Sequence, residues 1–363
     1  MSTNEDLLYS DKKVNTQYFS CPNCGGKTRF NPKLQKVECE YCGTTFDVDK
    51  SVNVTERSIE ELLEKGTAWT GTEVIKCPNC GAKEIVSKND ISKPCPFCGT
   101  TNIVTTEELP GLKPQGVCPF EIPQEDASGI AKKWVKKKIF APNAFKKSAQ
   151  AKNIHGVYSP AFTFDSETTS TYKGMLGVYE QRTRPGPNGT VETYTVLRSF
   201  PVSGTYDATF DDMIVQASTN IPFNVLNKIE PFPTNNAPKY NQAFLRGYSS
   251  NTYSKDGQQC WAECKMNMDS EIKHQVLRKY HHDVVETFHL NTTHKKSSYK
   301  YLLLPIYIGH HNFKEKLYNF YINGSTGKIW GKSPLSFWKV SLAVLLGLGI
   351  AALIGIGIYF SKK

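Results

Sequence analysis

The start of the chain lacks the long apolar run of a secretory signal. The stretch MSTNEDLLYSDKK carries acidic residues, among them Glu5 and Asp6, where a signal peptide carries only bases. We therefore expect the N-terminal bulk of the protein to remain in the cytoplasm.

Acidic residues are also scarce, with 34 against 44 basic residues in 363 and a formal net charge of +10. No acid occurs between Asp126 and Asp165, where two short helices are predicted, from Glu125 to Lys138 and from about Pro142 to Gln150. This stretch contains Lys132, Lys133, Lys136, Lys137, Lys138, Lys146, Lys147 and Lys152, interleaved with Ile130, Trp134, Phe140 and Phe145. Such a patch is typical of contact with nucleic acid or with the anionic cytoplasmic leaflet, where Trp134 and Phe140 would sit at the interface. A merely solvated face is the third interpretation.

No catalytic constellation is evident, and we predict that the protein is not an enzyme. The segment GSTGKIWGKS is no phosphate-binding loop, because Gly327 and Gly331 enclose three residues where that loop needs four. Cys260 and Cys264 lie one helical turn apart and the chain has two histidine pairs, so a third metal site is conceivable but disfavoured, since cysteine is among the most often buried residue types.

Eight of the eleven cysteines form four C-x-x-C pairs, a spacing that favours metal binding in a reducing compartment over a disulfide framework. The predicted ligands form two quartets: Cys21, Cys24, Cys39 and Cys42, then Cys77, Cys80, Cys95 and Cys98. Each cysteine recurs 56 positions later, which indicates an internal duplication.

Zinc prefers four tetrahedral thiolate ligands, so we predict two structural Zn²⁺ ions per chain, one in each ribbon. A glycine follows each pair, at Gly25, Gly43, Gly81 and Gly99, where a tight turn calls for a positive φ. Modules this small need the metal to fold. Redox pairs are the disfavoured alternative.

The middle of the chain alternates apolar and polar residues in short runs, which predict strands. The runs are VYSPAFTFD, STYKGMLGVYE, VETYTVLRSF, GTYDATF, VVETFHLNTTH, YKYLLLPIYIGH and LYNFYINGSTGKIWG. A helical stretch is expected near Tyr240 to Lys279, a hairpin turn at Asn323-Gly324, and a short spacer helix after Ser58 with a capping box to Glu61.

Val340 to Phe360 contains no charge over 21 residues, enough at about 1.5 Å each to cross a hydrocarbon core of roughly 30 Å. Aromatic and basic residues flank both ends, as interfacial anchors do. Basic residues are similar in number on the two sides, so they do not indicate which end of the helix faces the cytoplasm. Small residues recur at every fourth position, Ala343, Gly347, Ala351 and Gly355, so this helix is also a candidate for homo-oligomer formation.

These observations predict a multidomain protein: two tandem small-β zinc ribbons, an α+β domain with antiparallel strands, and one C-terminal transmembrane helix. The expected segments are an N-terminal tail (1–18), ribbon 1 (19–50), a spacer (51–72), ribbon 2 (73–106), a linker (107–117), the α+β domain (118–332), a juxtamembrane stretch (333–339), the membrane helix (340–360) and a tail (361–363). The bulk would lie on the cytoplasmic side of the cell membrane.

This order of features resembles a family of bacterial zinc-ribbon membrane proteins often labelled primosomal protein N′ or replication-restart helicase-like. The resemblance rests on the doubled ribbons and on GVYSPAFTFD followed by YKGMLG, YNQAFLRGYSSNTYS and YKYLLLPIYIGHHNFKEKLYNFYINGSTGKIWGKSP. The chain offers no helicase motor, so that label reflects ribbon similarity alone. The resemblance implies a membrane-tethered adaptor, in some relatives associated with flotillin-like or phage-shock-type envelope-stress proteins.

We therefore expect a membrane-anchored cytoplasmic adaptor that meets membrane lipid and recruits protein partners. The alternative is a membrane-tethered nucleic-acid-binding protein, favoured by the ribbons and the lysines.

Overall fold

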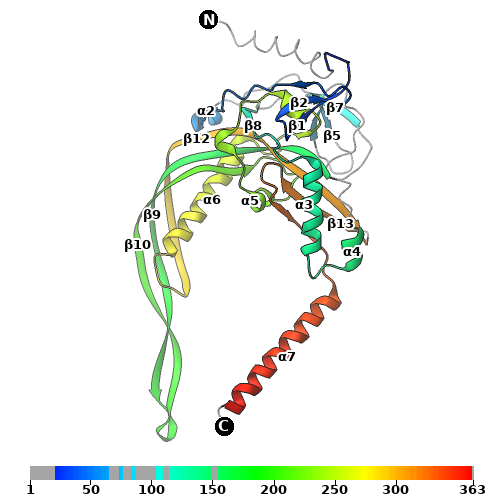
Figure 1. Ribbon diagram of the computed structural model, residues 1–363. Helices are drawn as coiled ribbons and strands as arrows, with labels where there is room; N and C mark the ends of the chain where they lie inside the picture. Colours follow the sequence, from blue (N-terminus) through cyan, green and yellow to red (C-terminus); the bar gives the residue numbers. More distant parts are fainter. Residues whose placement is uncertain are drawn as a thin grey trace.

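The computed structural model describes residues 21–64, 73–76, 83–86, 104–108, 114–148, 154–314 and 316–361. This part of the chain forms a small ribbon, a body built on one large sheet, a long arm that extends from the sheet, and a C-terminal helix (Figure 1). The ribbon lies at the opposite end of the body from the C-terminal helix.

The strands of the described residues form two sheets. The ribbon has three antiparallel strands: β1 (Thr28–Asn31), β2 (Lys36–Cys39) and β3 (Thr45–Phe46). The large sheet has eleven strands in the described residues and is antiparallel except where β8 joins β12 and β11 joins β9. Its strands are β4 (Arg57–Ser58), β5 (Glu73–Lys76), β6 (Lys83–Val86), β7 (Val104–Glu108), β8 (Gly116–Val117), β9 (Ile154–Pro185), β10 (Val191–Gln216), β11 (Ser249–Asn251), β12 (Val284–Phe313), β13 (Lys316–Asn323) and β14 (Ile329–Gly331).

The described residues form six α-helices and three 3₁₀ turns. They are α2 (Ile59–Glu64), α3 (Gln124–Lys137), α4 (Asn143–Ser148), α5 (Val225–Ile229), α6 (Gly257–Leu277) and α7 (Phe337–Ser361), with 3₁₀ turns at Pro187–Gly189, Thr234–Asn236 and Gln242–Leu245. The prediction of α2, α3 and α4 is confirmed. The helical prediction from Tyr240 was too broad, because a 3₁₀ turn and strand β11 precede α6.

The long strands correct the predicted pattern of short ones. VYSPAFTFD and STYKGMLGVYE belong to the single strand β9, the next two runs belong to β10, and the two after the helix belong to β12. The polar residues Ser166, Thr168 and Ser170, which lie between the first two runs or at the start of the second, continue the strand as buried residues. Thr168 Oγ1, for example, donates to the Ala208 carbonyl at 2.9 Å.

The three long strands build the arm, in the order β10, β9, β12 (Figure 1). Helix α6 covers one face of the arm, and its buried residues Cys264, Met268 and Ile272 belong to the same apolar cluster as Phe164 and Tyr172 of β9. Beyond Gly177 the arm narrows to β9 and β10 alone. One covered face and one open face are usual for antiparallel sheets.

In the body, by contrast, the sheet is buried on both faces. Leu302, Leu304 and Ile306 of β12 share a cluster with α5, whereas Leu303 and Tyr307 share one with α3 and the ribbon. This double burial explains why the run YLLLPIYI is apolar almost throughout instead of alternating.

The hairpin of β13 and β14 confirms the predicted turn after Asn323, with a different glycine at its centre. The Asn323 side-chain oxygen accepts from the N–H groups of Ser325 and Thr326, and the residue with positive φ (77°) is Gly327. Gly324 instead gives Phe120 room to pack, because a Cβ there would lie 2.4 Å from that ring.

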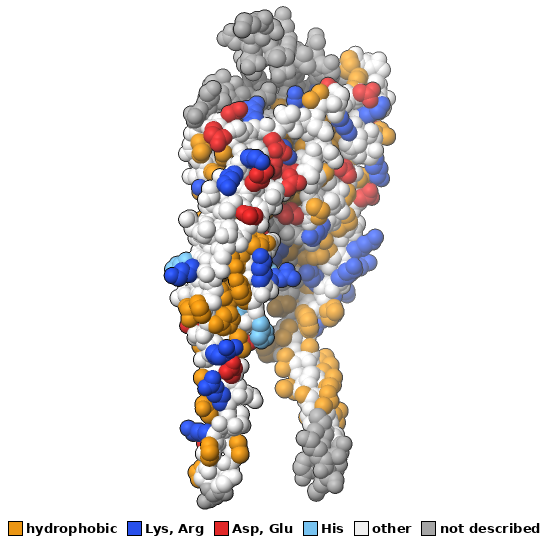
Figure 2. Space-filling model, turned by 90° about the vertical axis from the view of Figure 1, so that its left-hand side faces the viewer, with side chains coloured by type: hydrophobic (Ala, Val, Ile, Leu, Met, Phe, Trp, Pro, Cys, Tyr) orange, Lys and Arg blue, Asp and Glu red, His pale blue; other side chains and the backbone are white. Residues whose placement is uncertain are grey.

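Helix α7 and the arm project from the same side of the body (Figures 1 and 2). From Phe337 to Gly357 the helix has a mean hydropathy of 2.4 and no buried residue, so it is long and apolar enough to cross a membrane.

Candidate metal centre

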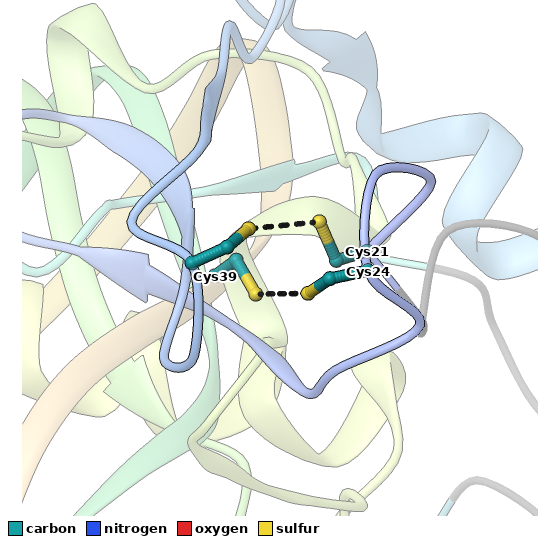
Figure 3. Close-up of side chains that lie close together, drawn as sticks. Cys21, Cys24 and Cys39 are labelled. Atoms are coloured by element: carbon teal, nitrogen blue, oxygen red, sulfur yellow. Dashed lines mark hydrogen bonds between the residues drawn. The ribbon is translucent and has the colours of Figure 1, made fainter.

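Four cysteine sulfurs converge beside the ribbon sheet (Figure 3). Cys21 Sγ lies 3.6 Å from Cys42 Sγ, Cys24 Sγ lies 3.5 Å from Cys39 Sγ, and all four sulfurs lie within 4.8 Å of one another. A disulfide bond would need about 2.05 Å. A tetrahedral ion with metal–sulfur bonds of about 2.3 Å separates its ligands by about 3.8 Å. The quartet therefore fits a zinc ion and does not form disulfides.

Two matching turns place the sulfurs. The N–H of Gly25 donates to the Cys21 carbonyl at 2.7 Å, and the N–H of Gly43 donates to the Cys39 carbonyl at 3.1 Å. Both glycines have positive φ, 71° and 70°, which confirms the predicted need for glycine. Because four thiolates fill a tetrahedral shell, the geometry leaves no open position for a reacting ligand, and this is the pattern of a structural site.

Before a metal binds, the thiols of the quartet differ in acidity. Hydrogen bonds from the Thr44 side chain and backbone lower the pKa of Cys42 to about 6. The Gly26 backbone acts in the same direction on Cys24, but the neighbouring thiols of Cys42 and Cys39 outweigh it and raise the pKa of Cys24 to about 12. Metal binding must therefore displace protons, so zinc affinity falls as the pH is lowered.

Ribbon 1 is docked on the body. Phe30, fully buried, meets the Phe244 ring at a centroid distance of 5.3 Å, and its N–H donates to the Arg246 carbonyl at 3.0 Å. Gln35 Nε2 donates to the carbonyl of Phe120 at 2.7 Å. The ribbon and the body thus share one apolar core.

The predicted spacer helix is also part of the packed structure. Ile59 and Leu62 of α2 are buried in the cluster beneath α6, and strand β4 just before the helix pairs with β12. The capping bond of Ser58 is made with Glu60 and not with the expected Glu61.

The second quartet, Cys77, Cys80, Cys95 and Cys98, lies outside the described residues, as do Gly81 and Gly99. Strands β5 and β6 flank the first of its cysteine pairs and are antiparallel, with Lys76 opposite Lys83. Strand β6 then pairs with β11, which joins the large sheet.

The disfavoured third metal site is not formed in the described part of the chain, where the Cys21 quartet is the group with metal-binding geometry. Cys260 and Cys264 are buried in the arm core, and that burial raises the pKa of each thiol to about 12. His310 stacks beside His155 at a ring-centroid distance of 6.1 Å. Two imidazoles alone do not complete a metal shell.

The predicted lysines lie on α3, on α4 and in the loop between them. Lys132, Lys133, Lys136, Lys137 and Lys147 are exposed, and no ion pair links them to any described residue. Trp134 is half-buried and turns toward the body, where its ring centroid lies 6.1 Å from that of Phe320. Lys152 lies outside the described residues.

Sequence reasoning missed a partly buried charge cluster where the arm leaves the body. Lys300 Nζ lies 2.7 Å from Asp212 Oδ1 and 3.3 Å from Glu56 Oε1, and the Asp212 N–H donates to Asp165 Oδ1 at 2.6 Å. Burial, and then the Glu56 carboxylate, raise the pKa of Asp165 to about 6. Its members come from four distant segments, so no local motif could reveal the cluster.

Comparison with known proteins gives one distant relative. The chain is 25% identical over 330 residues to the uncharacterized protein YdjG of Bacillus subtilis (strain 168), covering 89% of this chain and 92% of the relative. The similarity therefore extends well beyond the ribbons. No family model matches the chain, and no solved structure matches it.

Proposed function

We propose that this protein is a membrane-anchored cytoplasmic adaptor that recruits protein partners to the membrane, with envelope stress as its setting. Both cysteine quartets bind zinc in this proposal, and helix α7 is the anchor. The proposal gives the protein no catalytic step.

The observation that supports this function most strongly is the continuous packing from ribbon to anchor. The ribbon contributes Phe30 to the core that also contains Ala131 of α3. At the other end, the Ser336 N–H, just before α7, donates to the Phe140 carbonyl at 2.8 Å. A partner bound to the ribbon would therefore be held at a fixed height above the bilayer, which is what an adaptor requires.

The exposed face of the ribbon carries an aromatic residue whose contact with a protein partner can be tested. Tyr41, next to the ligand Cys42, is exposed, and exposed aromatic residues often dominate protein interfaces. The full chain is solubilised from membranes in detergent after nuclease treatment and cross-linked to its partners. We expect nuclease-resistant capture that drops severalfold in Tyr41→Ala, with the zinc content unchanged.

A matched control is Phe223→Ala, which removes an exposed aromatic side chain from the body. Capture that is abolished by nuclease, or that is equal for the native chain and for a chain lacking residues 21–50, would contradict the adaptor.

Nucleic-acid binding remains the second candidate because the exposed lysines of α3 have no acidic partner among the described residues. If it is correct, affinity must fall steeply with salt, since each neutralised phosphate releases counterions. Replacing Lys132, Lys133, Lys136, Lys137 and Lys147 by glutamine would then lower the salt slope by several units. Sub-micromolar, length-dependent binding at physiological salt would favour this candidate over the adaptor.

A further inference from the structure

The first turn of α7 is bonded to the loop between α3 and α4. Lys339 Nζ donates to the Ala141 carbonyl and to Asn143 Oδ1, each at 2.8 Å, and the Ser336 N–H donates to the Phe140 carbonyl at 2.8 Å. These bonds hold the loop beside the point where the apolar helix begins. Whatever surrounds the first turn of α7 must therefore also meet the loop.

Large apolar side chains are exposed on both sides of this junction. Ile139 and Phe140 of the loop are 74% and 42% exposed, and Leu335, Phe337 and Trp338 beside them are 70%, 77% and 81% exposed. Isolated exposed apolar residues are ordinary, whereas a contiguous group marks a contact surface. We call these five residues the root patch.

Positive charge lies next to the root patch. Helix α3 runs toward the root of α7 with its C-terminal end nearer to it (Figure 1), and that end carries Lys136 and Lys137, both exposed. Its acids, Glu125 and Asp126, occupy the first turn at the far end of the helix. The charge of α3 is therefore polarised toward the anchor, as in helices that meet anionic lipid.

We propose that the α3–α4 loop is a second membrane-contacting element. Ile139 and Phe140 enter the boundary between headgroups and acyl chains of the anionic leaflet that α7 crosses, and the exposed lysines of α3 and α4 bind its headgroups. The inference rests on the proposed anchoring. A bilayer is the occupant because the root patch is continuous with the first turn of the membrane helix, at the level where interfacial aromatic residues are found.

The test places a fluorescent non-natural amino acid at one position of the full chain, which spares the zinc-binding cysteines. The protein is reconstituted in nanodiscs of brominated phosphatidylcholine with or without phosphatidylserine. We expect strong quenching for labels at Leu345 of α7 and at Phe140, and none at Tyr41. Quenching at Phe140 should be severalfold stronger with phosphatidylserine.

Paired substitutions test the charge. Lys136→Gln with Lys137→Gln should abolish the phosphatidylserine dependence at Phe140. The control Lys27→Gln with Lys33→Gln, which removes the same charge from exposed positions of the ribbon, should leave that dependence intact. Equal quenching in neutral and anionic nanodiscs would overturn the role of the headgroups.

The outcomes separate this inference from the proposed anchor. Quenching at Leu345 without quenching at Phe140 would overturn the inference and leave the anchor standing, whereas no quenching at either position would overturn both. A benzophenone amino acid at Ile139, irradiated in native membranes, distinguishes the occupants. A phospholipid adduct supports the inference, and cross-linking to a second copy or to another protein in place of lipid contradicts it.

Discussion

Cys39 joins the metal quartet to the ribbon sheet, because it is both a predicted ligand and the last residue of β2. Replacing it with serine removes a thiolate that zinc needs, so we expect Cys39→Ser to lose one zinc per chain and to unfold the first ribbon. Elemental analysis of chelator-free protein should give two equivalents for the native chain and one for the variant.

Cys118→Ser is the matched control. This buried thiol points to the Pro233 carbonyl at a sulfur–oxygen distance of 3.7 Å and lies outside both quartets, so its substitution should leave both zinc ions bound. One equivalent in the native chain would contradict the proposed second site, and an unchanged count in Cys39→Ser would contradict the first.

Asp165 makes stability depend on pH. Its pKa is raised from 3.8 to about 6, chiefly by burial. Between those values the folded state holds a proton that the unfolded state has lost, so the free energy of unfolding falls as the pH rises through this window and stays level above it. The hydrogen bond with Asp165 lowers the pKa of Glu56. The contribution of Glu56 to the free energy of unfolding therefore rises with pH, opposite to that of Asp165.

Asp165→Asn should therefore stabilise the protein near pH 7, because an amide oxygen still accepts from the Asp212 N–H. Discounted for partial exposure, the gain is on the order of 1 kcal/mol, or about 2–4 °C in Tm. The difference in Tm between Asp165→Asn and the native chain should vanish toward pH 4. Thermal unfolding in detergent between pH 4 and pH 7 measures this difference, and Glu167→Gln is the exposed control. Equal Tm values for the two variants at every pH would refute the raised pKa of Asp165.

Single elements differ in how far the sequence determines them. The cysteine turns, α3, α4 and α7 depend on spacing and local composition, so they could be predicted from sequence. The length of β9 could not, because Ser166 and Ser170 signal a turn locally and continue a strand only when α6 and β12 surround them: the Ser170 hydroxyl, for example, donates to Thr292 Oγ1 at 3.0 Å. The docking of Phe30 likewise depends on Phe244, more than two hundred residues away.

Helix α7 offers a test of self-association. A Cβ added at Gly347 or Gly355 meets nothing within 4 Å in the single chain, so their leucine variants should still fold and insert. If the predicted small-residue face mediates a dimer, Gly347→Leu with Gly355→Leu should weaken it by at least about tenfold, because close backbone approach is lost.

Gly349→Leu with Gly357→Leu is the control, with the same spacing on another face of the helix and equally open surroundings. Cross-linking in membranes at several protein-to-lipid ratios measures both variants. Equal cross-linking of the two would show that this face does not mediate association.

At the scale of the whole molecule, the proposed anchoring of α7 in a bilayer must be reconciled with the position of the arm. The arm and α7 project from the same side of the body (Figure 2), yet the distal arm cannot enter hydrocarbon. Beyond Gly177 it is a two-stranded ribbon whose free edges carry unpaired backbone groups, which lipid cannot satisfy. Its ion pairs, such as Arg184 with Glu192 at 2.9 Å, are equally unsuited to lipid.

We therefore predict that the tip of the arm stays at the headgroups or in water while α7 spans the membrane, which requires the axis of α7 to incline away from the arm. A fluorescent label at Tyr194, near the tip, should be quenched in brominated nanodiscs less than a third as strongly as a label at Leu345. A water-soluble quencher should show the reverse order. Deleting residues 340–363, which keeps the bonds of Lys339 to the loop, should return the label at Tyr194 to its value in free solution. Equal lipid quenching at Tyr194 and Leu345 would place the tip in the hydrocarbon and would exclude this arrangement of body, arm and anchor.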